Sequence, residues 1–307
     1  MISKEEFRQK CASILDENDI ASFKEKRKVR KIALSVSLPI EGFIALIIAV
    51  AIHSIFSLIV LPIFLVTVVI TLVIIYVSTY VNLENYKEKY VYKLLELLID
   101  GYKYEYSHSG YIEPEVYKRS PYSAYYERYH GEDLVKINIP NDDGSPSDVV
   151  MYLSDLDLTK TEEDSDGDSH TVTVFSGCLG YIEFPFQFKC AIGINHCYAN
   201  KKLTRLKTED IAFNKNLKIY TDNELEAVVI LSPKMMEKLN NFKSKSGGFS
   251  LVINNDKLFI HLYNNLFQLK SSKEGINERT FDDIYDDVYL ILSIVEEIKN
   301  NNKIFKM

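Results

Sequence analysis

A long apolar run near the N-terminus constrains this chain more than any other feature. Between Ile32 and Leu83 the only formally charged residue is Glu41, and most of the others are aliphatic or aromatic. A single helix over this run would be roughly 78 Å long, whereas the hydrocarbon core of a bilayer is only about 30 Å thick. The run is therefore predicted to fold back and to cross a membrane twice, as a helical hairpin over residues 32–83.

The position of the reversal follows from the length of each half. A turn near residues 53–57 leaves two stretches, 34–55 and 58–80, and each has the about 20 residues that one crossing requires. Pro62 then falls in the first turn of the second helix, where its missing N–H group costs nothing.

The charges that flank the run predict its orientation. Residues 24–31 include six Lys or Arg, the apex of the hairpin carries none, and Lys87, Lys89 and Lys93 follow the second span. Because positive flanks stay on the cytoplasmic side, both termini are expected in the cytoplasm of a two-span protein of the cell membrane. A cleaved signal peptide is the competing interpretation, but the apolar run starts too late and is too long for one.

Glu41 has two readings that the sequence leaves open. A carboxylate near the bilayer centre costs about 2.5–3.5 kcal/mol on insertion scales, so such a residue is a candidate intramembrane functional group. If the first span begins nearer Leu38, however, Glu41 lies about one turn inside it and reaches the headgroups.

Composition excludes one class of partner. The net charge of −7 and the pI near 5.5 argue against a nucleic-acid-binding protein, which needs a basic surface. The four cysteines (Cys11, Cys178, Cys190 and Cys197) form no CxxC pair, and a cytoplasmic location predicts that they are free thiols.

The remaining chain divides into three regions around the hairpin. Residues 1–31 are predicted to hold a cytosolic amphipathic helix, because Ser3 and Glu6 form a capping box, followed by the basic flank. Residues 84–101 continue the second span as an amphipathic stalk helix that ends at Gly101. Residues 102–307 form a cytosolic domain, which opens with a tyrosine-rich stretch that reads either as a packed collar or as compositional bias.

The cytosolic domain is predicted to be α+β, with an antiparallel sheet and packed helices. Asn255-Asp256 forms the turn of a hairpin, and Thr221 with Glu224 forms a second capping box before a helix over 225–231. A further helix restarts at Pro233 and carries Met236, Leu239 and Phe242. The last helix begins at Thr280, and its predicted buried face consists of Ile284, Val288, Ile291, Val295 and Ile298. The other predicted strands are 134–139, 148–153, 170–175 and 181–192.

Two clusters resemble metal sites but fail in detail. In Asp164 to His170 the glycine comes too early for an EF-hand and the twelfth position is Phe175, so a hairpin loop is the better interpretation. Cys190, His196 and Cys197 are one ligand short of a structural zinc site and lack its spacing. No nucleophile, Walker or dinucleotide motif occurs, so no catalytic residue, metal or cofactor is predicted.

Three stretches of the sequence resemble a known bacterial family. They are Glu132-Asp133, the strand Val174-Phe175-Ser176-Gly177, and residues 206–239. Together they resemble the membrane proteins catalogued as domain of unknown function 3137. Ser176 replaces the usual basic residue and Asn216-Leu217 replaces a common aromatic, so the chain resembles a divergent member. The resemblance implies a two-span hairpin and a cytosolic domain, and it implies no activity.

A non-enzymatic role is the preferred functional expectation. The chain is expected to be a membrane-anchored cytosolic binding or scaffold module, whose partners are the lipid bilayer and either another protein or further copies of itself. The alternative is a membrane-anchored enzyme with an unrecognised cytosolic active site. A transporter would need more than two spans, unless the chain oligomerises.

Overall fold

The computed structural model describes residues 2–15, 66, 68, 70, 89–140, 149–196, 203–245, 248–267 and 278–300. The basic flank, Glu41 and the two predicted spans lie outside these residues, apart from helical Val66, Val68 and Ile70. Within the described part of the chain, no helix combines the length and the apolar character needed to span a bilayer.

The chain forms two compact units, and each is discontinuous in sequence. Unit 1 consists of Met1–Phe7, Leu94–Gln268 and Phe281–Met307, and unit 2 of Arg8–Lys93 and Leu269–Thr280. In unit 2, Cys11, Tyr90 and Val91 are buried. The predicted stalk helix is observed over residues 89–98, and Gly101 follows it in a left-handed conformation, with φ of 84°.

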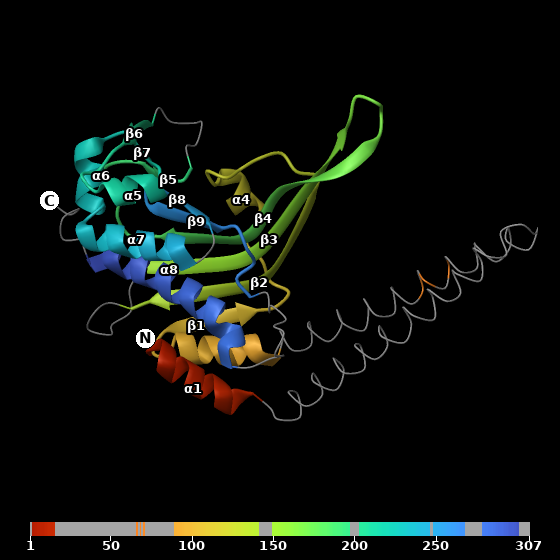
Figure 1. Ribbon diagram of the computed structural model, residues 1–307, viewed down its shortest axis with the longest axis horizontal. Coiled ribbons are helices and arrows are strands. Elements are labelled where there is room, and N and C mark those ends of the chain that lie inside the picture. The colour runs from red at the N-terminus through yellow and green to blue at the C-terminus, as the bar shows by residue number, and fades with distance from the viewer. Residues whose placement is uncertain are drawn as a thin grey trace, which may run out of the picture. The chain divides into compact units, whose positions relative to one another are not determined.

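Unit 1 is built on an antiparallel sheet of nine strands in the order β1-β2-β3-β4-β9-β8-β5-β7-β6 (Figure 1). The α+β prediction with an antiparallel sheet is confirmed. The strands are β1 (Lys103–Ser107), β2 (Arg128–Ile139), β3 (Val149–Glu163), β4 (Ser169–Glu183), β5 (Ile192–Ile194), β6 (Thr204–Leu206), β7 (Ile219–Thr221), β8 (Phe249–Asn254) and β9 (Lys257–Leu262).

Two of the hairpins in the sheet, β8–β9 and β3–β4, differ in how well the sequence predicts them. The β8–β9 hairpin turns at Asn255, whose φ is 56°, as predicted. The separate strands predicted over 170–175 and 181–192 are wrong in their bounds, because one strand, β4, runs through Gly177 and Gly180 and ends at Glu183. The tip of the β3–β4 hairpin is polar and exposed and projects from the sheet (Figure 1), so hydrophobic alternation does not mark its length.

Helices cover both faces of the sheet. On one face, Leu251 and Ile253 line the same apolar space as Leu239 of α7 (Pro233–Lys245) and Ile294 of α8 (Asp282–Asn300). Val252, which lies between these two strand residues, belongs to an aromatic cluster on the opposite face. There α4 (Pro114–Arg119) places Tyr117 against Phe175 and Phe259.

Helix termini follow local capping, with two corrections. The helix predicted over 225–231 is α6 (Glu224–Ile230), and its N-cap is Asn223, whose side chain accepts a hydrogen bond from the backbone N–H of Glu226. Thr221 instead donates its hydroxyl proton to the carbonyl of Ala191, so the predicted capping box is wrong. In α7 the buried methionine is Met235, beside the buried Leu239 and Phe242, whereas Met236 is half-buried.

Both ends of the chain contribute to unit 1. The N–H of Glu6 in α1 (Lys4–Ile14) donates to Ser3 Oγ at 3.2 Å, as expected for the predicted N-cap. Phe7 is fully buried, with its ring 5.0 Å from that of Tyr285 on α8. The predicted apolar face of the last helix is buried, after a short 3₁₀ turn, η1 (Glu278–Phe281). A further short helix among the described residues is α5 (Ile211–Asn216).

Candidate functional site

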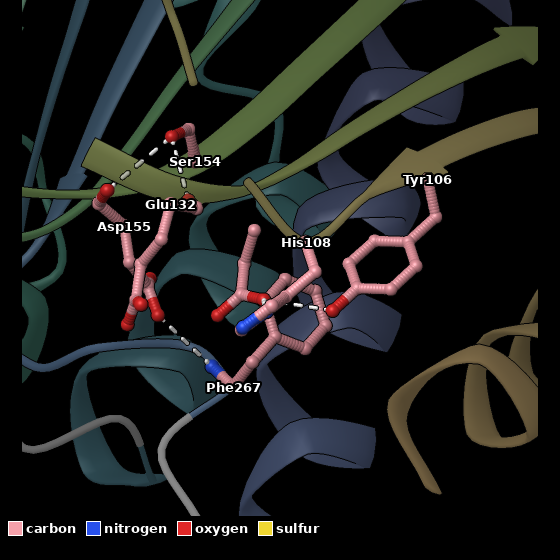
Figure 2. A network of polar contacts seen from close by, with 7 residues as sticks. Tyr106, His108, Glu132, Ser154, Asp155 and Phe267 are labelled. Carbon is pink, nitrogen blue, oxygen red and sulfur yellow. Dashed lines mark hydrogen bonds and ion pairs between the residues drawn. The ribbon is translucent and has the colours of Figure 1, made fainter. Parts of the chain in front are cut away.

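A buried polar network joins β1, β2 and β3 within unit 1 (Figure 2). Its two central carboxylates, Asp133 and Asp155, are 0% and 1% exposed. Carboxylates are almost never fully buried unless other groups satisfy them, so this network is the most unusual chemical feature of the described residues.

A bulge in β2 places Asp133. The register of β2 with β3 shifts between Glu132 and Val135, and Asp133 adopts a φ of 59°, which is uncommon for a residue with a side chain. Its backbone N–H donates to the carbonyl of His108 at 2.8 Å. This geometry turns the side chain of Asp133 away from the regular alternation of the strand.

Two side chains from the β1 end converge on Asp133. The hydroxyl of Tyr106 donates to Asp133 Oδ1 at 2.7 Å, and His108 Nδ1 lies 2.8 Å from the same oxygen. A carboxylate that accepts from Nδ1–H fixes the tautomer and the orientation of the imidazole. The side chain of His108 is 30% exposed, so the network reaches solvent there.

Asp155 receives its hydrogen bonds from the main chain. Its Oδ1 accepts from the N–H of Leu266 at 2.8 Å, and its Oδ2 accepts from the N–H of Phe267 at 3.3 Å. The neighbouring Ser154 hydroxyl donates to the carbonyl of Glu132 at 2.9 Å and thereby ties β3 to the bulge. The two main-chain hydrogen bonds satisfy both oxygens of a carboxylate that would otherwise be costly to bury.

Three carboxylates of the network could hold a cation by distance alone. Glu132, Asp133 and Asp155 each offer one oxygen, and these oxygens lie within 4.8 Å of one another. Oxygen donors suit hard cations such as Ca²⁺ and Mg²⁺. However, Asp133 Oδ1 and both oxygens of Asp155 already accept hydrogen bonds from protein donors, so the described arrangement is that of a hydrogen-bonded network.

Cys178 pairs with Asp155 across β3 and β4 but is not a reactive thiol. Burial raises its pKa well above the usual value, and the nearby carboxylates of Asp155 and Asp287 raise it further. A raised pKa disfavours the thiolate form that reactive cysteines need. As expected from the sequence, the described cysteines Cys11, Cys178 and Cys190 are free.

The structure describes most residues of the two clusters that the sequence singled out. Asp164 Oδ1 accepts the backbone N–H groups of Asp166 and Asp168 in the exposed β3–β4 turn, which confirms the hairpin interpretation. Cys190 is buried, His196 Nε2 lies 3.0 Å from the carbonyl of Pro121, and Cys197 lies outside the described residues. The network around Asp133 was missed, although Glu132-Asp133 is among the stretches that carry the family resemblance.

A second cluster of interest combines aromatic rings with two histidines. The ring of Phe175 stacks on His261 at 3.9 Å, and the ring of Tyr122 lies 4.8 Å from His196 and 5.6 Å from His261. Burial lowers the pKa of His261 to about 4 and also lowers the pKa of His196. Both imidazoles are therefore neutral at neutral pH.

Unit 1 is an α+β domain with one large antiparallel sheet and a buried polar network. Residues 173–300 match the family model described as "Protein of unknown function (DUF3137)", which is the family that the sequence was found to resemble. No curated protein matches the chain in sequence. A solved structure, that of the mycobacterial trehalose monomycolate transport factor A, TtfA, is similar at 9% identity and a TM-score of 0.35, over 64% of this chain and 89% of that chain. A likeness at that score carries no argument about function.

Proposed function

We propose that this protein is a membrane-anchored cytosolic binding or scaffold module rather than an enzyme. The observation that carries the binding role is an apolar stripe on α6. Leu225, Val228 and Val229 occupy positions i, i+3 and i+4 of this helix and are 84%, 56% and 38% exposed. Residues at this spacing lie on one helix face, which is how amphipathic helices present a surface to a protein partner.

The side chains opposite this stripe support its role as a surface. Ala227 and Ile230 are buried, so α6 already packs on the domain through its other face. Leu225 is therefore not required for the fold, and the exposure of three neighbouring apolar residues calls for a partner. That partner is another protein or a second copy of this chain.

A matched pair of variants tests the binding role. The full chain is purified in mild detergent, and native mass spectrometry measures its assembly with itself or with a captured protein at fixed stoichiometry. The double variant Leu225→Ser, Val228→Ser should lose that assembly and keep its circular dichroism spectrum. Tyr125→Ser, at a residue that is 73% exposed and follows α4, is the control. Equal assembly of both variants would remove α6 as the binding surface.

Membrane anchoring rests on the apolar run 32–83 and its basic flank. A cytoplasm-specific reporter fused after Met307 should be active. Labelling of Cys178 and Cys190 would be uninformative, because both are buried. Ser165→Cys at the exposed hairpin tip provides an accessible thiol, which an impermeant reagent should reach only in permeabilised cells. Labelling in intact cells would contradict the proposed orientation.

The pair of His108 and Asp133 favours an enzyme as the second candidate. A buried carboxylate that orients a partly exposed imidazole is an arrangement used in general acid–base catalysis. The discriminating measurement is a hydrolase screen of the purified chain beside His108→Gln. An activity that the parent has and the variant lacks would replace the non-enzymatic proposal.

A further inference from the structure

The place where the chain leaves unit 1 coincides with the buried carboxylates. Unit 1 runs without interruption from Leu94 to Gln268, and the next residues, Leu269–Thr280, belong to unit 2. Leu266 and Phe267, the last residues described before this exit, are 2% and 0% exposed. A chain that is about to leave a domain ordinarily lies at the surface of the domain. Specific interactions must therefore keep Leu266 and Phe267 in the interior.

Three hydrogen bonds hold this segment in the interior. The carbonyl of Asn264 accepts the N–H of Cys178 at 3.2 Å, and the N–H groups of Leu266 and Phe267 donate to the two oxygens of Asp155. The last two bonds do not belong to the sheet, because β9 ends at Leu262. The buried carboxylate in the middle of β3 therefore accepts the two backbone N–H groups that a neighbouring strand would otherwise bind.

The ring of Phe267 connects the exit to the rest of the network. It lies 6.3 Å from the ring of Tyr106, whose hydroxyl donates to Asp133. Asp155 therefore holds the backbone of Phe267, and the ring of Phe267 lies near Tyr106, which binds Asp133 (Figure 2).

We infer that Asp155 is a conformational clamp, whose carboxylate fixes the backbone of Leu266 and Phe267 to β3 within unit 1. The clamp acts through two main-chain hydrogen bonds rather than through apolar packing alone. This role is independent of the proposed binding surface on α6.

Amide hydrogen exchange of the full chain in mild detergent tests the clamp in the unmodified protein. With residue-resolved mass spectrometry, the amides of Leu266 and Phe267 should exchange at rates within tenfold of Ile260, a buried residue of β9. Exchange more than 100-fold faster than that of Ile260 would overturn the inference.

Asp155→Asn separates the clamp from general packing. Asparagine has almost the same shape, but an NH₂ group replaces one acceptor oxygen, so at most one of the two hydrogen bonds survives. Exchange at Leu266 or Phe267 should rise at least about tenfold, while the amides of α8 keep their protection. Unchanged exchange at both residues would contradict the clamp, and so would a loss of protection that spreads through α8.

The matched control lies two residues further along the same strand. Asp157 is exposed, and Asp157→Asn makes the same chemical change without touching the exit segment. Its exchange at Leu266 and Phe267 should equal that of the parent. If exchange at Leu266 and Phe267 rises as much in Asp157→Asn as in Asp155→Asn, the faster exchange comes from the lost charge on β3 and not from the lost hydrogen bonds.

Discussion

Acid should weaken unit 1 through His261, and His261→Gln should remove much of this sensitivity. The imidazole of His261 stacks on Phe175 and its Nε2 lies 3.0 Å from the carbonyl of Ser176, while the ring of Tyr263 lies 4.8 Å away. Burial lowers its pKa from 6.5 to about 4, and the neighbouring His196 adds to this shift. Glutamine retains an N–H donor for the Ser176 carbonyl and does not titrate.

The sign and the size follow from proton linkage. Because the folded pKa lies below the unfolded one, the folded state binds fewer protons, so stability is complete above pH 6.5 and is lost as the pH falls towards 4. A difference of this size corresponds to at most about 3 kcal/mol. Partial exposure of His261 reduces the expected loss to about 1–2 kcal/mol at about pH 5.

Urea titrations followed by circular dichroism, at about pH 7.5 and about pH 5, measure this loss. The parent should lose more free energy of unfolding than His261→Gln between the two conditions. His170→Gln, at the exposed hairpin tip, is the control and should behave as the parent does. Equal losses in the parent and in His261→Gln would refute the reasoning.

Three further predictions concern a cap, a core residue and the predicted membrane segment. Asn223→Ala should lower the free energy of unfolding by about 1 kcal/mol, measured by the same titration, because it removes the N-cap of α6. Leu239→Ala should cost about 2–5 kcal/mol, since Leu239 is 1% exposed in the apolar core, and a change below 1 kcal/mol would contradict the packing. If Glu41 hydrogen-bonds a neighbouring helix, Glu41→Gln should keep assembly in detergent and Glu41→Leu should weaken it; equal retention would leave Glu41 as a residue that reaches the headgroups.

Local signals in the sequence account for the elements that were predicted well. The β8–β9 turn at Asn255, the restart of a helix at Pro233 and the buried face of α8 each follow from a few adjacent residues. The Asn223 cap of α6 was missed because Thr221 and Glu224 offered a similar spacing. Competing caps only two residues apart are not separable without the φ and ψ of the chain.

The polar network around Asp133 and Asp155 could not be predicted from the sequence, for a different reason. Asp133 and Asp155 belong to different strands and meet only through the register of β2 with β3. The bulge after Glu132 then changes which face the following residues occupy, and no local pattern in the sequence marks it. The contact of Asp155 with Leu266 spans 111 positions, a separation for which sequence spacing gives no rule.

The three-piece construction of unit 1 has a consequence for the order in which it is made on the ribosome. Lys4 forms an ion pair with Asp286, and β4 pairs with β9, so early and late parts of the chain complete the same domain. Synthesis proceeds from the N-terminus, and Phe7 has no Tyr285 to pack against until α8 has emerged. Pairing at such separations is slow to form, so the nascent sheet lacks its cover until α8 has been translated.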